Sequence, residues 1–359
     1  MSLPEPAAPL EAPGANFDAE IRSQPAALRA LLEHLPAYAR VAGAARSRGA
    51  TTVRMVGHGS SDNAASYGVY AFGLLPRWTA LRDSITLTAY YEARLDMEGS
   101  IVIGLSQSGR TPDVIDYVSR ARRLGAHTIA LTNDVGSELA GEAEEVLPLA
   151  AGTERAVAAT KTYLNQVAAL GLFAACAAGE GRRFAEQIRV TADILEGVIP
   201  SFEAQVRTMA LPFASVGRMF VIGRGTEFAT AREIALKLLE TCRIAAEPLT
   251  ATDLAHGPVA ALDPLFPVWT IASGDETLPA VVEAAERVRA AGGALVASGT
   301  AADALSGAAY VLPIPKPPSP LLTPLLSVVP GQLFAAALAR ARGLDPDRPA
   351  GLSKVTLAR

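Results

Sequence analysis

The sequence predicts an α/β fold made of two similar three-layer αβα subdomains, each built around a parallel sheet. Short apolar runs alternate with helical segments along the chain, which is typical of parallel sheets covered by helices. Two landmarks recur at nearly one offset. The glycine-rich loop at 57–60 returns at 223–226, and the loop that begins at Ser106 returns at Ser273. This repeat indicates a duplicated subdomain.

The elements follow from composition and periodicity. Residues 1–16, rich in proline and alanine, are expected to form a disordered tail. Residues 17–45 have helical spacing, with Pro25 at a helix start and Pro36 at a helix end. Strands are expected at 52–56, 85–89, 101–105, 128–131, 146–149, 219–222 and 268–272, and helices from 64 and at 113–124, 156–178 and 184–209. The predicted organisation is a first subdomain with its N-terminal helix at 17–207, a second at 208–343, and a docking C-terminal tail at 344–359.

Composition excludes several classes of function. The 359 residues, half of them hydrophobic, are enough for two domains. A net charge of −4 gives no general attraction to nucleic acid or to an anionic membrane, so neither is expected as a partner. Cys176 and Cys242 form no disulfide framework or zinc pattern, which favours free thiols in a reducing cytoplasm. The N-terminus lacks the basic start and apolar block of a secretory signal. We expect a cytoplasmic protein with no metal and no cofactor.

The longest uncharged stretch, 321–339, contains two prolines, a serine and a glutamine. These residues are unusual in a stretch that must face lipid along its length. The pattern therefore predicts a loop followed by a buried helix and not a membrane span.

One stretch, 101–112, combines a buried strand with a polar loop. The apolar run 101–105 is followed by Ser106, Gln107, Ser108 and Thr111, and Pro112 then favours the first turn of a helix. Hydroxyl groups, free backbone N–H groups and the positive end of a helix dipole together suit a phosphate. No Gly-Lys-Ser/Thr follows, so the loop is not a P-loop. The alternative is an ordinary serine-rich turn whose hydroxyls cap their own backbone.

The second copy of this loop differs in charge. Gly274, Asp275, Glu276 and Thr277 stand where the first copy has its amide and hydroxyl side chains. Two carboxylates would repel a phosphate. The sequence therefore predicts a phosphate site in the first half only.

Six motifs lie in order along the chain, at 57–64, 105–111, 151–161, 231–241, 255–258 and 352–354. Together they are similar to the motifs of the sugar isomerase (SIS) domain proteins, and the likeness covers almost the whole chain after the first fifteen or so residues. The chain most resembles the isomerase half of glucosamine-6-phosphate synthase and, more closely, the standalone glucosamine-6-phosphate deaminases of the SIS type. This resemblance implies two flavodoxin-like subdomains. It also implies that the phosphate is held by Ser61, Ser106, Gln107, Ser108 and Thr111, with Gly59, Ser60, Val157 and Ser353 as neighbours.

Two departures favour the standalone branch. The synthase carries an N-terminal glutaminase domain with an N-terminal cysteine nucleophile, whereas Ser2 stands at residue 2 here and there is no room for that domain. The synthase also has an acidic residue where Arg110 stands. Glutamine-driven amination by this chain alone is therefore not expected.

Glu240 and Lys237 are candidates for proton transfer between C1 and C2 of a sugar. Both lie on a predicted helix, three residues apart and on the same face. From the residues alone, a surface ion pair is the commoner meaning of this spacing. The resemblance favours active-site roles, with Glu240 as the base and Lys237 keeping that carboxylate ionised.

His256 and Lys354 complete the set of candidates. His256 precedes Gly257-Pro258 and is suited to sugar ring opening. In the family, its position reaches into the partner subunit's site, which implies a homodimer. Lys354 lies in an apolar tail that is expected to dock, and the matching lysine of the synthase can form a Schiff base with the ketose. His58, in the first polar loop, is expected to border the site.

The resulting hypothesis is a glucosamine-6-phosphate deaminase that gives fructose 6-phosphate and ammonia, with a hexose 6-phosphate as its small-molecule partner. An aldose–ketose isomerase or a deglycase on a related amino-sugar phosphate would use the same groups. A non-catalytic sugar-phosphate sensor is a third alternative. Such a sensor needs the phosphate-binding residues but not the base or the histidine, and it usually carries a DNA-binding or other partner domain. No basic helix-turn-helix pattern is visible.

Overall fold

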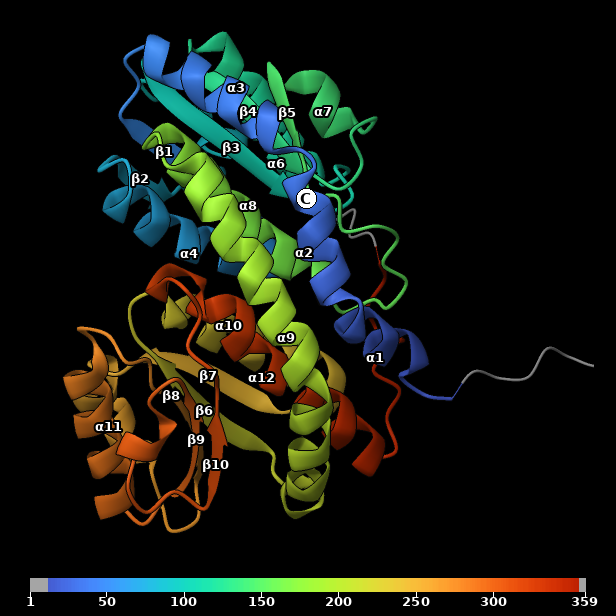
Figure 1. Ribbon diagram of the computed structural model, residues 1–359, viewed down its shortest axis with the longest axis vertical. Helices are drawn as coiled ribbons and strands as arrows, with labels where there is room; N and C mark the ends of the chain where they lie inside the picture. The colour runs from blue at the N-terminus through green and yellow to red at the C-terminus, as the bar shows by residue number, and fades with distance from the viewer. Residues whose placement is uncertain (1–11, 355–359) are drawn as a thin grey trace, which may run out of the picture.

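The computed structural model describes residues 12–354, and within them two five-stranded sheets lie in separate halves of the molecule (Figure 1). The first sheet has the order β2-β1-β3-β4-β5 and the second the order β7-β6-β8-β9-β10. The strands of the first sheet are β1 (Thr52–Val56), β2 (Thr79–Arg82), β3 (Ser100–Ser106), β4 (His127–Thr132) and β5 (Glu145–Pro148). Those of the second sheet are β6 (Arg218–Gly223), β7 (Ala245–Thr250), β8 (Pro267–Ile271), β9 (Ala294–Gly299) and β10 (Tyr310–Pro313).

Both sheets are parallel and share one topology. Counted along each half, the strand order is 2-1-3-4-5, the flavodoxin-like order. Val53 on β1 pairs with Ile101 on β3, and Phe220 on β6 pairs with Val268 on β8, so equivalent strands are neighbours in both halves. The predicted α/β fold and its duplication are therefore confirmed.

Helices cover both faces of each sheet, which gives the three layers. The helices before the second sheet are α1 (Ala15–Arg22), α2 (Gln24–Leu32), α3 (Leu35–Ser47), α4 (Ser60–Leu74), α5 (Ile85–Ala89), α6 (Pro112–Arg123), α7 (Glu138–Glu142), α8 (Lys161–Ala177) and α9 (Gly181–Ala210). The helices that follow β6, the first strand of the second sheet in the chain, are α10 (Glu227–Cys242), α11 (Leu278–Ala290) and α12 (Thr323–Ala341). Along β3, Ile101 and Ile103 belong to the core that includes α8, whereas Val102 belongs to the core beneath α6.

The two halves meet through helices. The 30-residue helix α9 runs past both halves, and α10 and α12 lie together near the junction (Figure 1). Helix α10, from the second half, also packs against α4, which follows the polar loop after β1. Side chains of α10 are thereby brought to the carboxyl edge of the first sheet, where parallel sheets bind ligands.

One predicted strand is wrong. Residues 85–89 form the short helix α5, and the strand is β2, a few residues earlier. The β-branched composition of Ile-Thr-Leu-Thr-Ala resembles a strand, but Ile85 and Thr88 are buried together at helical spacing, where α5 packs on α6. β2 is an edge strand whose side chains do not alternate between buried and exposed positions, so its sequence does not show the pattern of a strand.

The N-terminal region also differs from its prediction. Residues 17–45 form three helices, and Pro36 lies in the first turn of α3 and not at a helix end. Residues 1–11 of the predicted tail lie outside the described part of the chain, but residues 12–16 are ordered. The backbone N–H of Gly14 donates to Asp345 Oδ1 at 3.0 Å, and that of Asn16 donates to Asp347 Oδ2 at 3.0 Å.

Helix α8 begins at Lys161, five residues later than predicted, because Glu154 caps its start from outside. The Glu154 carboxylate accepts from the backbone N–H groups of Thr160 and Thr162. The sequence did not predict β7, β9 and β10.

One segment of the described chain, Pro320–Ala341, is long and apolar enough to cross a membrane, but 89% of its most apolar window is buried inside the protein, as in a core helix.

Candidate functional site

The two polar loops after β1 and β3 meet at the point where the strand order reverses. Ser106 Oγ and Thr111 Oγ1 are 3.0 Å apart, and Gln166 on α8 donates to Ser61 Oγ at 2.9 Å. Gly109 has a φ of +63°, and a Cβ there would lie 1.9 Å from Ser137 Oγ, so this tight loop requires glycine. The loop then enters α6 at Pro112, as predicted.

A cavity of about 690 Å³ opens above these loops. The structure brings together all five residues that were predicted to hold phosphate, and it adds Lys354 from the far end of the chain. The predicted residues that line the cavity are Gly59, Ser61, Ser106, Gln107, Ser108, Thr111 and Lys354. Hydroxyl donors, an amide and the N-terminus of α6 therefore face one space, as an anion site requires.

A second, smaller cavity of about 190 Å³ adjoins the first. It contains the remaining predicted neighbours, Ser60, Val157 and Ser353, together with Glu240. His58, Ser61, Gln107 and Lys354 line both cavities, so the two spaces share a wall. The predicted phosphate grip and the predicted base thus border adjoining spaces within one chain.

Helix α10 supplies a buried charge network to the smaller cavity. Lys237 is fully buried, and its Nζ lies beside Glu240 Oε2 and 3.4 Å from Glu233 Oε1. Burial alone would lower the pKa of Lys237, but the two carboxylates outweigh it and raise the pKa. The lysine is therefore a cation. The Glu240 side chain is 21% exposed, so it is the member of the pair that solvent or a ligand can reach.

Glu233 is a member of the network to which sequence reasoning gave no role. Its carboxylate accepts from Ser60 Oγ and from Asn63 Nδ2, each at 2.9 Å, and burial raises its pKa. These contacts hold α10 against the first turn of α4, which follows the loop after β1. A glutamate one turn before Lys237 is visible in the sequence, but nothing local distinguishes it from a surface residue.

The described part of the C-terminal segment packs against the first subdomain. Lys354 Nζ donates to Glu154 Oε2 and to the carbonyl of Ala156, each at 2.7 Å. Asp347 O also accepts from the backbone N–H of Val157 at 3.0 Å. Residues 355–359 lie outside the described part of the chain.

The partner of Lys354, Glu154, is a second residue that sequence reasoning missed. Its side chain is fully buried and accepts from Thr162 Oγ1 at 2.7 Å as well as from two backbone N–H groups. Burial raises the pKa of Glu154, but Lys354 and these hydrogen bonds outweigh burial and lower it overall. Glu154 is thus an ionised carboxylate that fixes the tail lysine in the site.

Replacing Glu154 with glutamine should flatten the acid side of the stability profile. The folded pKa of Glu154 lies below its ordinary value of 4.5. Its ionisation therefore stabilises the fold above that pH, and the stabilisation is lost as the pH falls through the folded pKa. The amide does not titrate. Urea unfolding of both proteins at several pH values between about 3 and 7 measures how the unfolding free energy depends on pH. If the two proteins lost stability in parallel as the pH falls, Glu154 would not titrate as described.

His256 is not brought to this site by its own chain. It ends a short exposed turn, Asp253–His256, after β7 and lines neither cavity. The histidine that does line both cavities is His58.

The equivalent loop of the second half carries the predicted acidic groups. Asp275 Oδ1 accepts from the backbone N–H and the hydroxyl of Thr277, at 2.8 and 2.6 Å. Gly274 donates its N–H to Thr300 Oγ1 at 2.9 Å. In the second half, donors equivalent to the predicted phosphate donors of the first half are therefore partly occupied by a carboxylate.

Ser108→Ala should weaken binding of a hexose 6-phosphate by about 1–3 kcal/mol, because a hydrogen bond to a charged group is lost. Thr277→Ala, the matched change in the second half, should leave the dissociation constant nearly unchanged. Isothermal titration calorimetry with fructose 6-phosphate measures both. Equal losses would show that both halves bind substrate.

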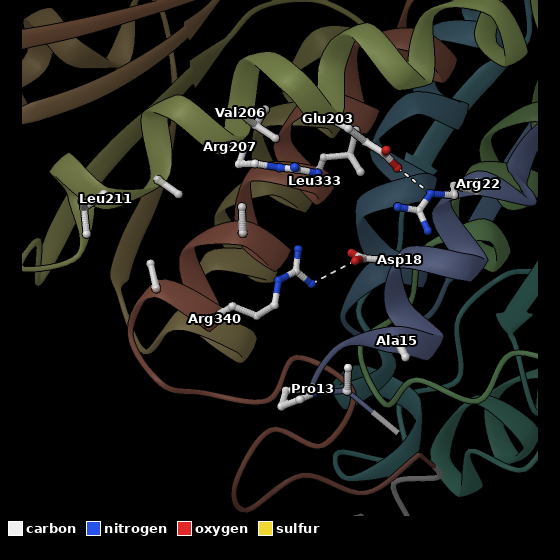
Figure 2. A pocket seen from close by; sticks show the side chains of 14 residues that line it. Pro13, Ala15, Asp18, Arg22, Glu203, Val206, Arg207, Leu211, Leu333 and Arg340 are labelled. Atoms are coloured by element: carbon white, nitrogen blue, oxygen red, sulfur yellow. Dashed lines mark hydrogen bonds and ion pairs between the residues drawn. The ribbon is translucent and has the colours of Figure 1, made fainter. Parts of the chain in front are cut away.

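A separate pocket of about 470 Å³ lies between α1, α9 and α12 (Figure 2). Its side chains include two ion pairs, Arg22 with Glu203 and Arg340 with Asp18. None of the predicted site residues lines it.

Comparisons with known proteins agree with this architecture. The SIS domain model matches residues 48–176 and again residues 213–341. A glutamine–fructose-6-phosphate aminotransferase from Aeropyrum pernix is 36% identical over 93% of this chain and 56% of its own length, and one from Corynebacterium efficiens is 32% identical over 94% and 57%. The chain thus spans about half the length of the curated relatives it matches.

Solved structures show the same fold. A Silicibacter pomeroyi protein assigned as a phosphosugar isomerase is 32% identical, with a TM-score of 0.81, over 92% of this chain and 99% of that one. The C-terminal domain of a Francisella tularensis glucosamine-fructose-6-phosphate aminotransferase superposes with a TM-score of 0.85 at 22% identity, over 95% and 100% of the two chains. The chain belongs to the SIS domain family, with one SIS domain in each half.

Proposed function

We propose that this chain is a phosphosugar enzyme that deaminates glucosamine 6-phosphate to fructose 6-phosphate and ammonia. The observation that carries the proposal is the common wall of the two cavities. One cavity has the donors to grip a phosphate, and the other has the Glu240 carboxylate. A hexose 6-phosphate has its phosphate at one end and C1–C2 at the other, so a single substrate can occupy both.

The proposed roles follow from chemistry at the two ends. The cradle formed by Ser61, Ser106, Gln107, Ser108 and Thr111 holds the phosphate. Glu240 accepts the proton that moves between C1 and C2, and Lys237 keeps it ionised. The Lys354 ammonium, fixed by Glu154, offers a positive charge near the oxygen or nitrogen on which charge develops.

The relatives support the phosphosugar class. Aminotransferases named for fructose 6-phosphate are similar over more than nine-tenths of this chain. A glucosamine-6-phosphate deaminase from Thermotoga maritima has a similar fold, with a TM-score of 0.76 at 20% identity. The choice of deamination over isomerisation rests on the motifs that resemble the standalone branch.

The direct test is to incubate the purified protein with glucosamine 6-phosphate and to measure ammonia and fructose 6-phosphate together. Equal amounts of both products are expected. No ammonia above background, with conversion of another aldose or amine-linked sugar phosphate in a panel, would replace deamination with isomerisation or deglycation. Binding of these sugars without any conversion would point to a sensor.

The subunits are also proposed to pair as a homodimer in which His256 borders the partner's site. The exposed position of His256, away from the cavities of its own chain, supports this arrangement. A chain of 37.2 kDa should then sediment at about twice that mass in analytical ultracentrifugation. A monomer at micromolar concentration would contradict the pairing.

A further inference from the structure

Glu20 is a buried carboxylate on α1 to which the proposed reaction assigns no role. It is 6% exposed, and its two oxygens accept from successive backbone N–H groups, Oε1 from Arg155 and Oε2 from Ala156 at 3.3 Å. Burial raises the pKa of Glu20 above its ordinary value of 4.5, and the two N–H groups oppose that rise. Both oxygens therefore serve to hold a loop that follows Glu20 by 135 residues.

The loop that Glu20 holds is also the loop that holds Lys354. Lys354 Nζ donates to Glu154 Oε2 and to the carbonyl oxygen of Ala156, each at 2.7 Å. Ala156 is thus bonded on both sides, because its N–H donates to Glu20 and its carbonyl accepts from the lysine. Only the two backbone torsions of Ala156 separate these groups. Holding the N–H in place therefore restricts where the carbonyl, and the ammonium bound to it, can lie.

The C-terminal segment in turn holds the start of α1. The Asp347 carboxylate accepts from the backbone N–H groups of Phe17 at 2.7 Å and Asn16 at 3.0 Å, and thereby caps the helix. The backbone carbonyl of Asp347 accepts from the N–H of Val157 at 3.0 Å. Glu20 lies about one turn after Phe17. Helix, loop and tail thus form a closed circuit of hydrogen bonds, in which Glu20 joins the helix to the loop.

We propose that Glu20 is a positioning residue, which sets the place of the Lys354 ammonium in the site through the loop 154–157. Lys354 lines both cavities, so a shift of this loop moves a positive charge relative to a bound sugar phosphate. Glu20 lines neither cavity, so it acts through the lysine. The inference rests on the proposed function, because it takes the Lys354 ammonium as a group that stabilises charge in the reaction.

A double-mutant cycle on kcat tests this role. Glu20→Gln keeps one oxygen as an acceptor but turns an NH₂ group towards the second loop N–H, so the loop should shift. Because small misplacements of a reacting group are costly, kcat for the best hexose 6-phosphate substrate should fall by about 10–100-fold, with KM within about twofold of wild type. In the Lys354→Ala protein, the same change should lower kcat by less than about twofold, because the group it positions is gone.

Amine labelling reads the position of Lys354 without any turnover. With trace acetic anhydride and peptide mass spectrometry, Glu20→Gln should raise the labelling rate of Lys354 by about three- to tenfold, the usual effect of losing one hydrogen bond on a local opening. Two lysines are internal references. Exposed Lys316 should keep its rate, and fully buried Lys237 should stay unlabelled unless the whole fold opens.

Matched variants separate positioning from stability. Glu33→Gln, at the exposed end of α2, should leave both kcat and labelling unchanged. Glu20→Asp keeps the carboxylate but draws it back by one methylene, so it should change both quantities in the same direction as Glu20→Gln. It serves as the test variant if the glutamine protein does not fold.

The outcomes distinguish this inference from the proposed function. An equal fall of kcat in the wild-type and Lys354→Ala backgrounds, or an unchanged labelling rate of Lys354 in an active protein, would overturn the role of Glu20 and keep the function. Labelling of Lys354 that depends on Glu20, in a protein that converts no hexose 6-phosphate, would keep Glu20 as the residue that places the lysine and would reject the proposed function.

Discussion

Replacing Glu240 with glutamine is expected to lower kcat by about 10²–10⁴-fold and to change KM little. The amide keeps the shape of the side chain but cannot accept a proton from carbon. The proposed phosphate-binding residues line the other cavity, so affinity should survive. Steady-state kinetics on the best substrate of a hexose 6-phosphate panel measures both constants.

Glu247→Gln is the matched control, since Glu247 is an exposed residue on β7 and lines neither cavity. It should behave as wild type. If the Glu240→Gln protein turned over substrate at close to the wild-type rate, the Lys237–Glu240 pair would have a structural role only.

Replacing Lys354 with alanine should have the second largest effect, because this residue has a proposed role in the reaction and also pairs with a buried carboxylate. Loss of a positive charge placed where negative charge develops commonly lowers kcat by about 10²–10³-fold. The change also removes the charged partner of the buried Glu154. An unfolding free energy lower by about 1–3 kcal/mol is therefore expected, since Glu154 keeps its three other hydrogen bonds.

A double variant separates the two effects. Adding Glu154→Gln to Lys354→Ala removes the unpaired buried charge, so stability should recover while activity stays low. Urea unfolding and steady-state kinetics on the same preparations give both quantities. If activity returned together with stability, Lys354 would only secure the tail.

The gathering of the proposed phosphate-binding residues around one cavity could be predicted from the sequence because its signal is local. The strand, the hydroxyl-rich loop and the helix start that form it lie within 101–112, and Ser61 follows the preceding strand of the same kind. Parallel topology then brings the ends of β1 and β3 together. No contact beyond neighbouring strands was needed.

The buried carboxylates could not be predicted because their partners are distant in the sequence. Glu154 meets Lys354 across 200 residues, and Glu233 meets Ser60 across 173. Neither separation along the chain follows the period of a helix or a strand, so no local sequence pattern indicates these contacts. Their roles follow from how the second subdomain and the tail pack on the first.

The misassigned strand has the same kind of explanation. Residues 85–89 have β-branched composition, but contact with α6 makes them a helix. The true edge strand β2 and the proline-containing edge strand β7 are partly exposed and show no clear alternation. Composition identified the central strands β1, β3, β4, β6 and β8 and the edge strand β5, but it missed β9, a central strand that is almost wholly buried.

The proposed reaction moves a proton between C1 and C2 of a hexose 6-phosphate. The most direct measurement is NMR of glucosamine 6-phosphate and fructose 6-phosphate incubated with the protein in D₂O. We predict that deuterium appears at C1 or C2, and that Glu240→Gln abolishes the incorporation while both sugars still bind. Sugars that bind in the cavity but are neither converted nor labelled, even by the wild-type protein, would contradict the proposed proton transfer.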